Sequence, residues 1–458
     1  MGNAVLKFVM DILSEPAVLV SIIALVGLVI QKKPASDIIK GTTKSFLGFI
    51  VISAGASILV SSLDPFGKMF QEAFHVNGVV PNNEAIVAMA LSEYGSSTAL
   101  IMFFGMIANI LVARFTKLKY IFLTGHHTLY MACMIAVILV AAGLKGFQLA
   151  FVGSLALGLI MAIFPALAQP FMRKITGNDQ VGFGHFSTLG YALSGAIGSL
   201  VGKNSRSTEK INFPKGLGFL RDSSISIALT MTILYIIVAI IAGPDYIEKN
   251  LSGGKNFIVF SIIQAITFAA GVFIILSGVR LVLAEIVPAF KGISTKLVPN
   301  AKPALDCPIV FPYAPNAVLI GFFCSFLGGI VGMMILGIAG SIIILPGVVP
   351  HFFTGATAGV FGNATGGIRG ATIGSFANGL LITFLPVFLM PVLGDLGFAN
   401  TTFSDADFGA SGIVLGYIAN DLGSVGITVT IIAAVVIAVV LSFIRNKKNA
   451  SPDHTTNV

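Results

Sequence analysis

Long apolar runs alternate with short polar loops along almost the whole chain. A helix needs about 20 apolar residues to cross the hydrocarbon core of a bilayer, and eleven runs come near that length. The predicted spans are 15–31, 45–63, 98–113, 121–143, 147–168, 224–243, 257–287, 315–338, 351–368, 371–393 and 422–444. This pattern predicts an all-α polytopic membrane protein with about eleven transmembrane helices.

Two further stretches, 81–97 and 301–316, are too polar to cross a membrane alone and too apolar for ordinary loops. Each carries a carboxylate, a Tyr, and Gly or Pro. Irregular backbone at membrane depth is tolerated only where protein or a water-filled cavity satisfies its polar groups. We therefore expect a re-entrant hairpin at each stretch.

The composition supports a membrane protein and excludes several other classes. Of the 458 residues, 56% are hydrophobic and only 10% are charged, whereas a soluble domain carries about 25% charge. This excludes a water-soluble enzyme, a secreted disulfide scaffold and a disordered chain. The net charge of +8 is spread over short loops, so no nucleic-acid partner is expected. Cys133, Cys307 and Cys324 lack metal-binding or redox spacing, and we expect neither a metal nor another cofactor.

The distribution of Lys and Arg predicts the orientation, because cytoplasmic loops of membrane proteins are enriched in them. With eleven spans and a cytoplasmic C-terminus, the N-terminus lies outside. Then 21 basic residues fall on the inner side and 5 on the outer side. The segment 394–410 holds Asp395, Asp405 and Asp407 but no Lys or Arg, as expected for an outer loop.

Three short matches between the two halves of the chain indicate an internal repeat. Glu93-Tyr94 parallels Pro312-Tyr313, with the Tyr residues 219 apart. IFLTG at 121–125 parallels IILPG at 343–347, an offset of 222, and a Leu-Gly-Tyr triplet at 189 recurs at 415. Two five-helix repeats of opposite orientation are typical of secondary transporters, whose substrate site lies where broken helices meet.

The repeat predicts how the single permease domain is organised. The first repeat is expected at 1–220 with a cytoplasmic loop at 169–223, the second at 224–421, a last helix at 422–444, and a disordered cytoplasmic tail at 445–458.

Ionisable groups within membrane segments are functional candidates, because each costs about 2.5–3.5 kcal/mol on insertion scales. Asp306 is the strongest candidate for contact with a ligand, since it lies in an irregular apolar segment. Its alternative role is to accept backbone hydrogen bonds within the hairpin. Asn83 and Glu84 open the first hairpin, where they either contact the substrate or cap a half-helix.

Histidine and tyrosine side chains complete the candidate site. His126 either contacts the substrate or lies neutral between helices. His185 belongs to a Gly-rich segment that is too apolar for a plain loop, and we expect it to dip toward the site. Tyr94 and Tyr313 either hydrogen-bond a sugar hydroxyl or only brace the hairpins.

Other conspicuous residues are interpreted as structural. We expect His127 and His351 to be packing residues, and the glycine cluster FGNATGGIRG at 361–370 to permit close helix packing. The chain contains no Walker A motif, so it is not an ATP-driven pump.

Long ordered stretches resemble one family. Residues 38–59, 123–126, 278–322 and 345–371 resemble the membrane (IIC) component of the bacterial phosphotransferase system for L-ascorbate. The resemblance covers nearly the whole chain. It implies a homodimer in the bacterial cytoplasmic (inner) membrane, with a core domain that holds the substrate and moves in an elevator-like way against a V-shaped dimerisation domain. It also implies that a separate IIB protein, served by IIA, phosphorylates the sugar.

The resemblance also implies substrate contacts at Asn83, Glu84, Tyr130, His185 and Asp306. The chain departs from the family pattern, because Tyr130 and the residue after it replace glutamines, and Glu84 replaces a neutral or aromatic residue. Three functions therefore stay open. They are uptake of L-ascorbate, uptake of another small sugar or sugar alcohol by the same machinery, and ion-coupled symport in which Glu84 and Asp306 are the coupling groups.

Overall fold

The computed structural model is mostly helical, as expected for a polytopic membrane protein. It describes residues 8, 16–74, 79–81, 83–211, 223–296, 298–347, 350–394 and 401–448. Within these residues, five helices are long and apolar enough to cross a membrane, or six if the bent pair α8–α9 is one span. The count of eleven spans stays a prediction.

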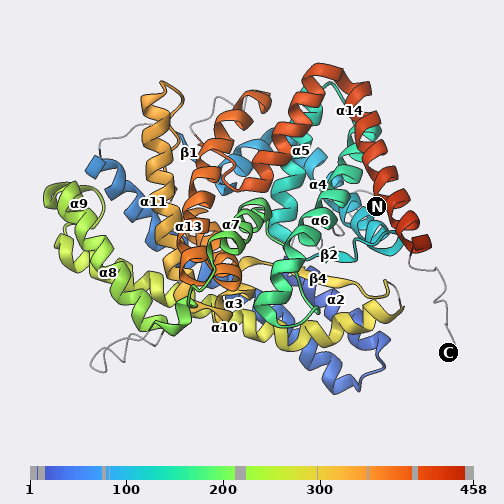
Figure 1. Cartoon of the computed structure of the whole chain (residues 1–458), viewed down its shortest axis with the longest axis horizontal. Coiled ribbons are helices and arrows are strands. Elements are labelled where there is room, and N and C mark those ends of the chain that lie inside the picture. The colour runs from blue at the N-terminus through green and yellow to red at the C-terminus, as the bar shows by residue number, and fades with distance from the viewer. Residues whose placement is uncertain are drawn as a thin grey trace, which may run out of the picture.

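One group of helices packs together along the lower side of Figure 1. It consists of α2 (Pro16–Ile30), α3 (Ala35–Phe74), α8 (Ser223–Ala242) and α10 (Phe257–Lys296). The short helix α9 (Pro244–Asn250) follows α8 after a bend of 100°. In this group α3 and α10, each 40 residues long, pack against each other.

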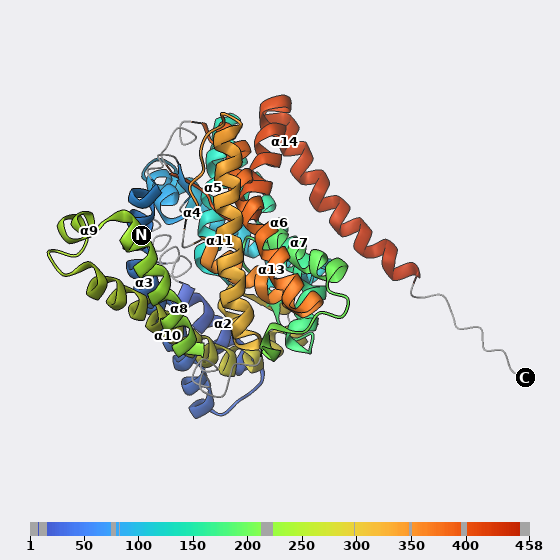
Figure 2. The ribbon, with the colours of Figure 1, turned by 60° about the vertical axis from the view of Figure 1, so that its left-hand side comes forward.

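A second group of helices contains the rest of the described helical chain and packs mainly on itself. Its members are α4 (Asn83–Phe115), α5 (Gly125–Ala141), α6 (Gly146–Thr176), α7 (Thr188–Val201), α11 (Pro315–Ile338), α13 (Ala356–Leu389) and α14 (Ala406–Lys448). A single π-helical turn, His351–Gly355, leads into α13. Helix α13 lies between α7 and α11 in both views of the ribbon (Figures 1 and 2).

Five very short strands bring distant parts of the second group together. Strands β2 (Tyr120–Phe122), β4 (Lys302–Leu305) and β3 (Gly182–Phe183) form a parallel sheet in the order β2-β4-β3, here named the first junction. Strand β1 (Val80–Pro81) pairs in parallel with β5 (Thr401–Thr402), and Val79 forms a bridge with Ile344; we name this arrangement the second junction.

Each junction receives its central strand from the opposite half of the chain. Strand β4, from the second half, pairs with β2 and β3 of the first half. Strand β1, from the first half, pairs with β5, and the residue before it pairs with Ile344, both from the second half. The two halves are therefore interlocked through their strands.

The segments predicted as re-entrant hairpins have different structures. Residues 83–97 are not a hairpin, because they form the first turns of the continuous helix α4. Residues 301–316 contain β4 and two 3₁₀ turns, Cys307–Ile309 and Phe311–Tyr313, before α11 begins. This second stretch is irregular, as expected, but it does not consist of two helical arms.

Two predicted loops contain helices. The segment 169–223 holds the end of α6, strand β3 and the helix α7. The predicted outer loop 394–410 contains β5 and the first turns of α14, which continues through the expected last helix to residue 448. The rest of the expected disordered tail, from 449 onward, lies outside the described residues. The Leu-Gly-Tyr match is not a structural equivalence, because Leu189 is the second residue of α7 and Leu415 the tenth of α14.

Glycines break and pack the helices near the junctions. Helix α13 is kinked at Gly367, which has φ 57° and ψ −145°, and α14 is kinked at Gly423. A Cβ on Gly367 would lie 2.3 Å from the carbonyl oxygen of Arg206, so only glycine fits this left-handed position. Gly366 approaches Gly198 of α7 equally closely, which confirms that the 361–370 cluster serves helix packing. Ile427 and Ile431, beyond Gly423, are still buried, whereas the last turns of α14 project away from the other helices (Figure 2).

Candidate functional site

The first junction gathers ionisable residues at one edge. The carboxyl ends of parallel strands meet at the same edge of a sheet, and ligands bind there in open α/β sheets. His126 follows β2 by four residues, His185 follows β3 by two, and Asp306 directly follows β4. Residues about 60 to 180 positions apart in sequence are thereby brought together.

The second junction places its own polar residues at the corresponding edge. Asn83 follows β1, and Ser404 and Asp405 follow β5. The amide of Asn83 donates from Nδ2 to Asp405 Oδ1 (3.2 Å) and accepts at Oδ1 from the backbone N–H of Ser404 (2.9 Å). The hydroxyl of Ser404 also donates to Asp405 Oδ1, at 2.7 Å.

The two edges meet in one group of five side chains, His126, His127, His185, Asp306 and Asp405, which we name the His–Asp cluster. Nε2 of His185 lies 3.7 Å from Asp405 Oδ2 and 3.9 Å from Asp306 Oδ1. Nε2 of His126 lies 3.6 Å from Asp306 Oδ2, and Nε2 of His127 lies 4.0 Å from Asp405 Oδ2.

Exposure within the His–Asp cluster is uneven. The side chains of His127, His185 and Asp405 are each 4% exposed, whereas those of His126 and Asp306 are 43% and 24% exposed. The cluster is therefore accessible only on the side of His126 and Asp306.

Aromatic rings enclose the buried side of the cluster. The ring of His127 stacks on Phe408, at 5.6 Å and 3° between planes, and its centroid lies 4.0 Å from that of His185. The ring centroid of Tyr130 lies 5.8 Å from that of His126 and 6.1 Å from that of His127. Such apolar walls with a few convergent polar groups are typical of small-molecule sites.

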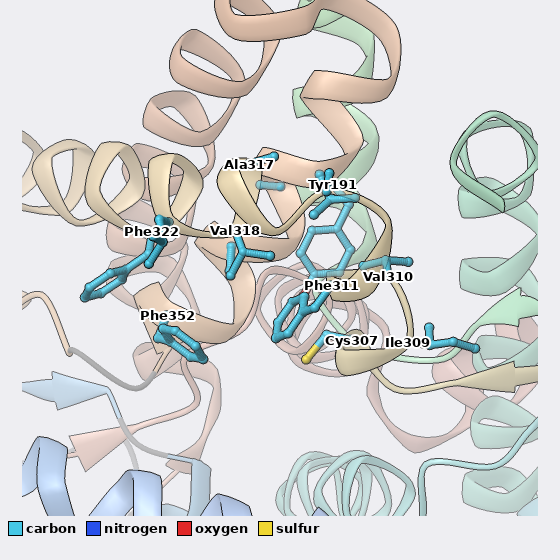
Figure 3. Packing of buried hydrophobic residues seen from close by; sticks show 14 of the residues in the cluster. Tyr191, Cys307, Ile309, Val310, Phe311, Ala317, Val318, Phe322 and Phe352 are labelled. Atoms are coloured by element: carbon cyan, nitrogen blue, oxygen red, sulfur yellow. The ribbon is translucent and has the colours of Figure 1, made fainter. Parts of the chain in front are cut away.

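A packed hydrophobic cluster supports the segment that carries Asp306. Tyr191 of α7 hydrogen-bonds Nδ1 of His185 through its hydroxyl, at 2.8 Å. Its ring belongs to the same buried cluster as Cys307 and Phe311, which follow Asp306 in the chain (Figure 3). His185 and Asp306 therefore rest on one rigid base.

Asp407 is a structural residue of the same region. Its two carboxylate oxygens accept from the backbone N–H groups of Thr188 (2.8 Å) and Leu189 (2.9 Å), and Asp407 thereby caps the N-terminus of α7. Ser187 in turn accepts from the N–H of Ala406 at the start of α14. The expectation of a loop is wrong at these residues, because Asp405 and Asp407 are 4% and 0% exposed and α14 begins at Ala406. The side of the membrane stays a prediction.

The structure brings together five of the eight predicted site residues. They are Asn83, His126, Tyr130, His185 and Asp306. Tyr94 packs against the hydrophobic cluster that contains residues of α4, α5 and α6. Tyr313 is 47% exposed. Within the described part of the chain, it makes no contact with the His–Asp cluster. The side chain of Glu84 lies outside the described part of the structure.

Sequence reasoning missed His127 and Asp405. His127 was interpreted as a packing residue, and it is indeed buried, but its ring forms part of the cluster. For Asp405 a signal was present, because Ser-Asp before an apolar helix is typical of an N-terminal cap. An acidic segment without Lys or Arg instead favoured an outer loop.

The ligand atoms of the His–Asp cluster are spaced closely enough to hold a metal ion. Three overlapping trios, two of them within the cluster and one that includes Cys307, have ligand atoms within 4.8 Å of one another. A metal ligand needs an unprotonated ring nitrogen. However, Nδ1 of His127 accepts the N–H of Phe186 (3.4 Å), which leaves the ring proton on Nε2, the atom that faces Asp405. This pattern favours hydrogen bonding over metal binding at His127.

A network of ion pairs lies at the opposite end of β4. Asp179 contacts Nζ of Lys302 at 2.6 Å and Nε of Arg173 at 2.8 Å, and it accepts from Gln169. Although partial burial alone would raise it, these three hydrogen bonds hold the pKa of Asp179 at about 2. Burial, with a smaller contribution from Asp179, raises the pKa of Tyr120 to about 12.

Comparison with known proteins identifies the family. The family model of the sugar-specific permease component of the phosphotransferase system (EIIC-GAT) matches residues 11–407. The chain belongs to this family. This membership confirms the resemblance to a phosphotransferase-system permease component noted from the sequence.

A curated relative is more specific. The ascorbate-specific EIIC component of the phosphotransferase system of Mycoplasma pneumoniae is 26% identical over 449 aligned residues, which cover 86% of this chain. The chain spans 66% of the length of that relative.

Proposed function

We propose that this permease takes up L-ascorbate or a closely related small sugar and presents it for phosphorylation by a separate IIB protein that receives its phosphoryl group from IIA. The observation that carries the proposal is the His–Asp cluster, in which the partly exposed carboxylate of Asp306 lies at the meeting point of both junctions. The name of the Mycoplasma pneumoniae relative makes L-ascorbate the first candidate.

The chemistry of the cluster suits a polyhydroxylated solute. Ionised carboxylates accept hydrogen bonds from hydroxyl groups, and imidazoles both donate and accept. The described cysteines, Cys133, Cys307 and Cys324, are buried or half-buried, which favours a phosphoryl donor outside this chain.

The architecture we propose follows the division into two helical groups. Helices α2, α3, α8 and α10 form the V-shaped dimerisation domain of a homodimer, and the second group forms the core that moves like an elevator. The chain crosses the inner membrane eleven times, with the N-terminus outside and the C-terminus in the cytoplasm. The exchange of central strands between the halves, and the offset of 222 residues between Phe122 and Ile344, support the inverted repeat.

Equilibrium binding of radiolabelled L-ascorbate to the purified protein tests the substrate. A label is needed because the chain has no Trp for fluorescence. We expect micromolar binding that unlabelled L-ascorbate displaces and neutral polyols and pentoses do not. Absence of binding by folded protein would contradict the assignment of L-ascorbate.

A neutral sugar or sugar alcohol is the second candidate substrate. The favouring observation is that two carboxylates, Asp306 and Asp405, flank the same ring nitrogen of His185. L-ascorbate is an anion at neutral pH, and negative charges repel it. Saturable binding of a labelled polyol by protein that does not bind labelled ascorbate would establish this alternative. Uptake that survives removal of phosphoenolpyruvate would instead indicate the ion-coupled symporter.

A further inference from the structure

One ring nitrogen of His185, Nε2, faces two carboxylates, those of Asp306 and Asp405. Nε2 lies 3.7 Å from Oδ2 of Asp405 and 3.9 Å from Oδ1 of Asp306, and the opposite nitrogen, Nδ1, faces the hydroxyl of Tyr191 at 2.8 Å. A nitrogen between two acceptors is best satisfied when it carries the ring proton. Tyr191 then donates to Nδ1, and Nε2–H is left to donate toward one carboxylate at a time.

The two carboxylates differ in how firmly they are held. Oδ1 of Asp405 accepts from Asn83 and Ser404, so its Oδ2 is fixed in the direction of the imidazoles, in a site that is 4% exposed. Asp306 is 24% exposed, and its Oδ1 already accepts the backbone N–H of Cys307 at 2.7 Å. A second hydrogen bond from His185 would fill both lone pairs of that oxygen.

We propose that Asp405 is a positioning residue of the transport site: it draws the Nε2–H of His185 away from Asp306 and thereby keeps the Asp306 carboxylate available for the hydroxyl groups of the solute. This inference rests on the proposed function, since it assigns Asp306 to the solute. Both carboxylates lie slightly beyond hydrogen-bond length from Nε2 of His185, and electrostatic attraction is stronger in buried surroundings, so a small turn of the ring brings its N–H to the buried Asp405 in preference to Asp306. The specificity of the site then depends on a residue that does not itself touch the solute.

The test compares two neighbouring buried aspartates. Asp405→Asn keeps the size of the side chain and removes its charge, so His185 turns toward Asp306 and competes with the solute. We expect the apparent KM for uptake, and the Kd in binding, to rise about tenfold or more, with the maximal rate little changed. Asp407→Asn is the matched control, because Asp407 caps α7. We expect it to lower the melting temperature and to leave KM within about twofold.

A double-mutant cycle separates positioning from mere packing. In a His185→Phe background no N–H competes for Asp306, so adding Asp405→Asn should raise KM by less than about threefold. Equal effects of Asp405→Asn in both backgrounds, an unchanged KM, or an equal rise from Asp407→Asn would each overturn the proposal.

The wild-type protein offers an independent measurement. The chain has six His, and ¹⁵N-histidine NMR with His185→Phe for assignment should find the proton of His185 on Nε2. A proton on Nδ1 would overturn the inference even if Asp405→Asn does not fold. Binding is measured with radiolabelled L-ascorbate and, as the neutral probe, radiolabelled xylitol. If neither binds the wild type, the substrate assignment fails while the NMR result still decides the role of Asp405.

Discussion

The two junctions are built alike but treat their polar residues differently. In each, a polar residue follows the central strand, Asp306 after β4 and Asn83 after β1. Asn83 is 8% exposed, and both ends of its amide bond to other protein groups, Asp405 and Ser404. The carboxylate of Asp306 is 24% exposed, and its imidazole neighbours stand 3.6–3.9 Å away.

This difference separates a structural contact from the proposed binding site. A buried polar group whose bonds are all made within the protein stabilises one arrangement of the chain. A group with remaining acceptor capacity at a partly exposed position is able to exchange water for a solute. Similar strand pairing thus joins the halves through satisfied hydrogen bonds at the second junction and leaves an accessible acceptor at the first, where we propose that the solute binds.

The largest effect is expected from Asp306→Asn. It removes a charged acceptor, and hydrogen bonds to charged groups contribute about 1.5–3 kcal/mol, or about 10- to 150-fold in affinity. We expect phosphoenolpyruvate-dependent uptake to fall to background while the melting temperature changes little. Unchanged uptake would remove Asp306 from the site.

Asn83→Ala should lower the melting temperature more than it lowers uptake, which is the reverse of the effect expected for Asp306→Asn. It deprives the buried N–H of Ser404 and the carboxylate of Asp405 of a partner, at a cost of about 1–3 kcal/mol. Circular dichroism at rising temperature measures the loss, which we expect to be several degrees. A melting temperature equal to that of the wild type would contradict the view that the hydrogen bonds of the second junction join the halves.

A matched pair of glycines sharpens the comparison between the junctions. A Cβ on Gly184, beside β4, would lie 2.6 Å from the backbone oxygen of Ala304, whereas one on Gly347 would lie 3.0 Å from Pro81 and Pro350. Gly184→Ala should therefore displace His185 and cost about 1–3 kcal/mol. Gly347→Ala should cost less, and the reverse order in thermal unfolding would refute this geometry.

The smallest effect is expected at the charged end of β4. The pKa of Asp179 is depressed to about 2, so its ion pairs stabilise the protein above the ordinary carboxyl pKa and are lost as the pH falls toward 2. Asp179 is 48% exposed, and solvent screens much of the interaction. Asp179→Asn should lower the melting temperature slightly at pH 7, and the difference from wild type should shrink on acidification. A constant difference would contradict the ion-pair explanation.

The sequence predicts continuous apolar helices well and short elements poorly. The predicted span 315–338 coincides with α11, and 224–243 nearly coincides with α8, because length and hydropathy suffice there. Helix α7 was missed because its Gly- and Ser-rich turns resemble a loop, although close helix packing requires those small residues. Strands of two to four residues give no periodic signal at all.

The candidate site could be predicted only in part. Asp306 and His185 were recognised because an ionisable group in an apolar stretch is costly. Asp405 escaped because its partner Asn83 lies 322 residues away, and a single sequence carries no record of such a contact. Acidic residues on a solvent-facing loop and in a buried hydrogen-bond network look the same until the chain is folded.

The exchange of central strands also determines when the paired strands can meet during synthesis of the chain. Strand β1 emerges early from the ribosome, but β5 follows only about 320 residues later, which at about 5–20 residues per second takes roughly a quarter of a minute to one minute. During this interval β1 lacks the partner strand that it has in the folded protein. The proposed transport site, which needs Asp405, is therefore among the last parts of the molecule that can form.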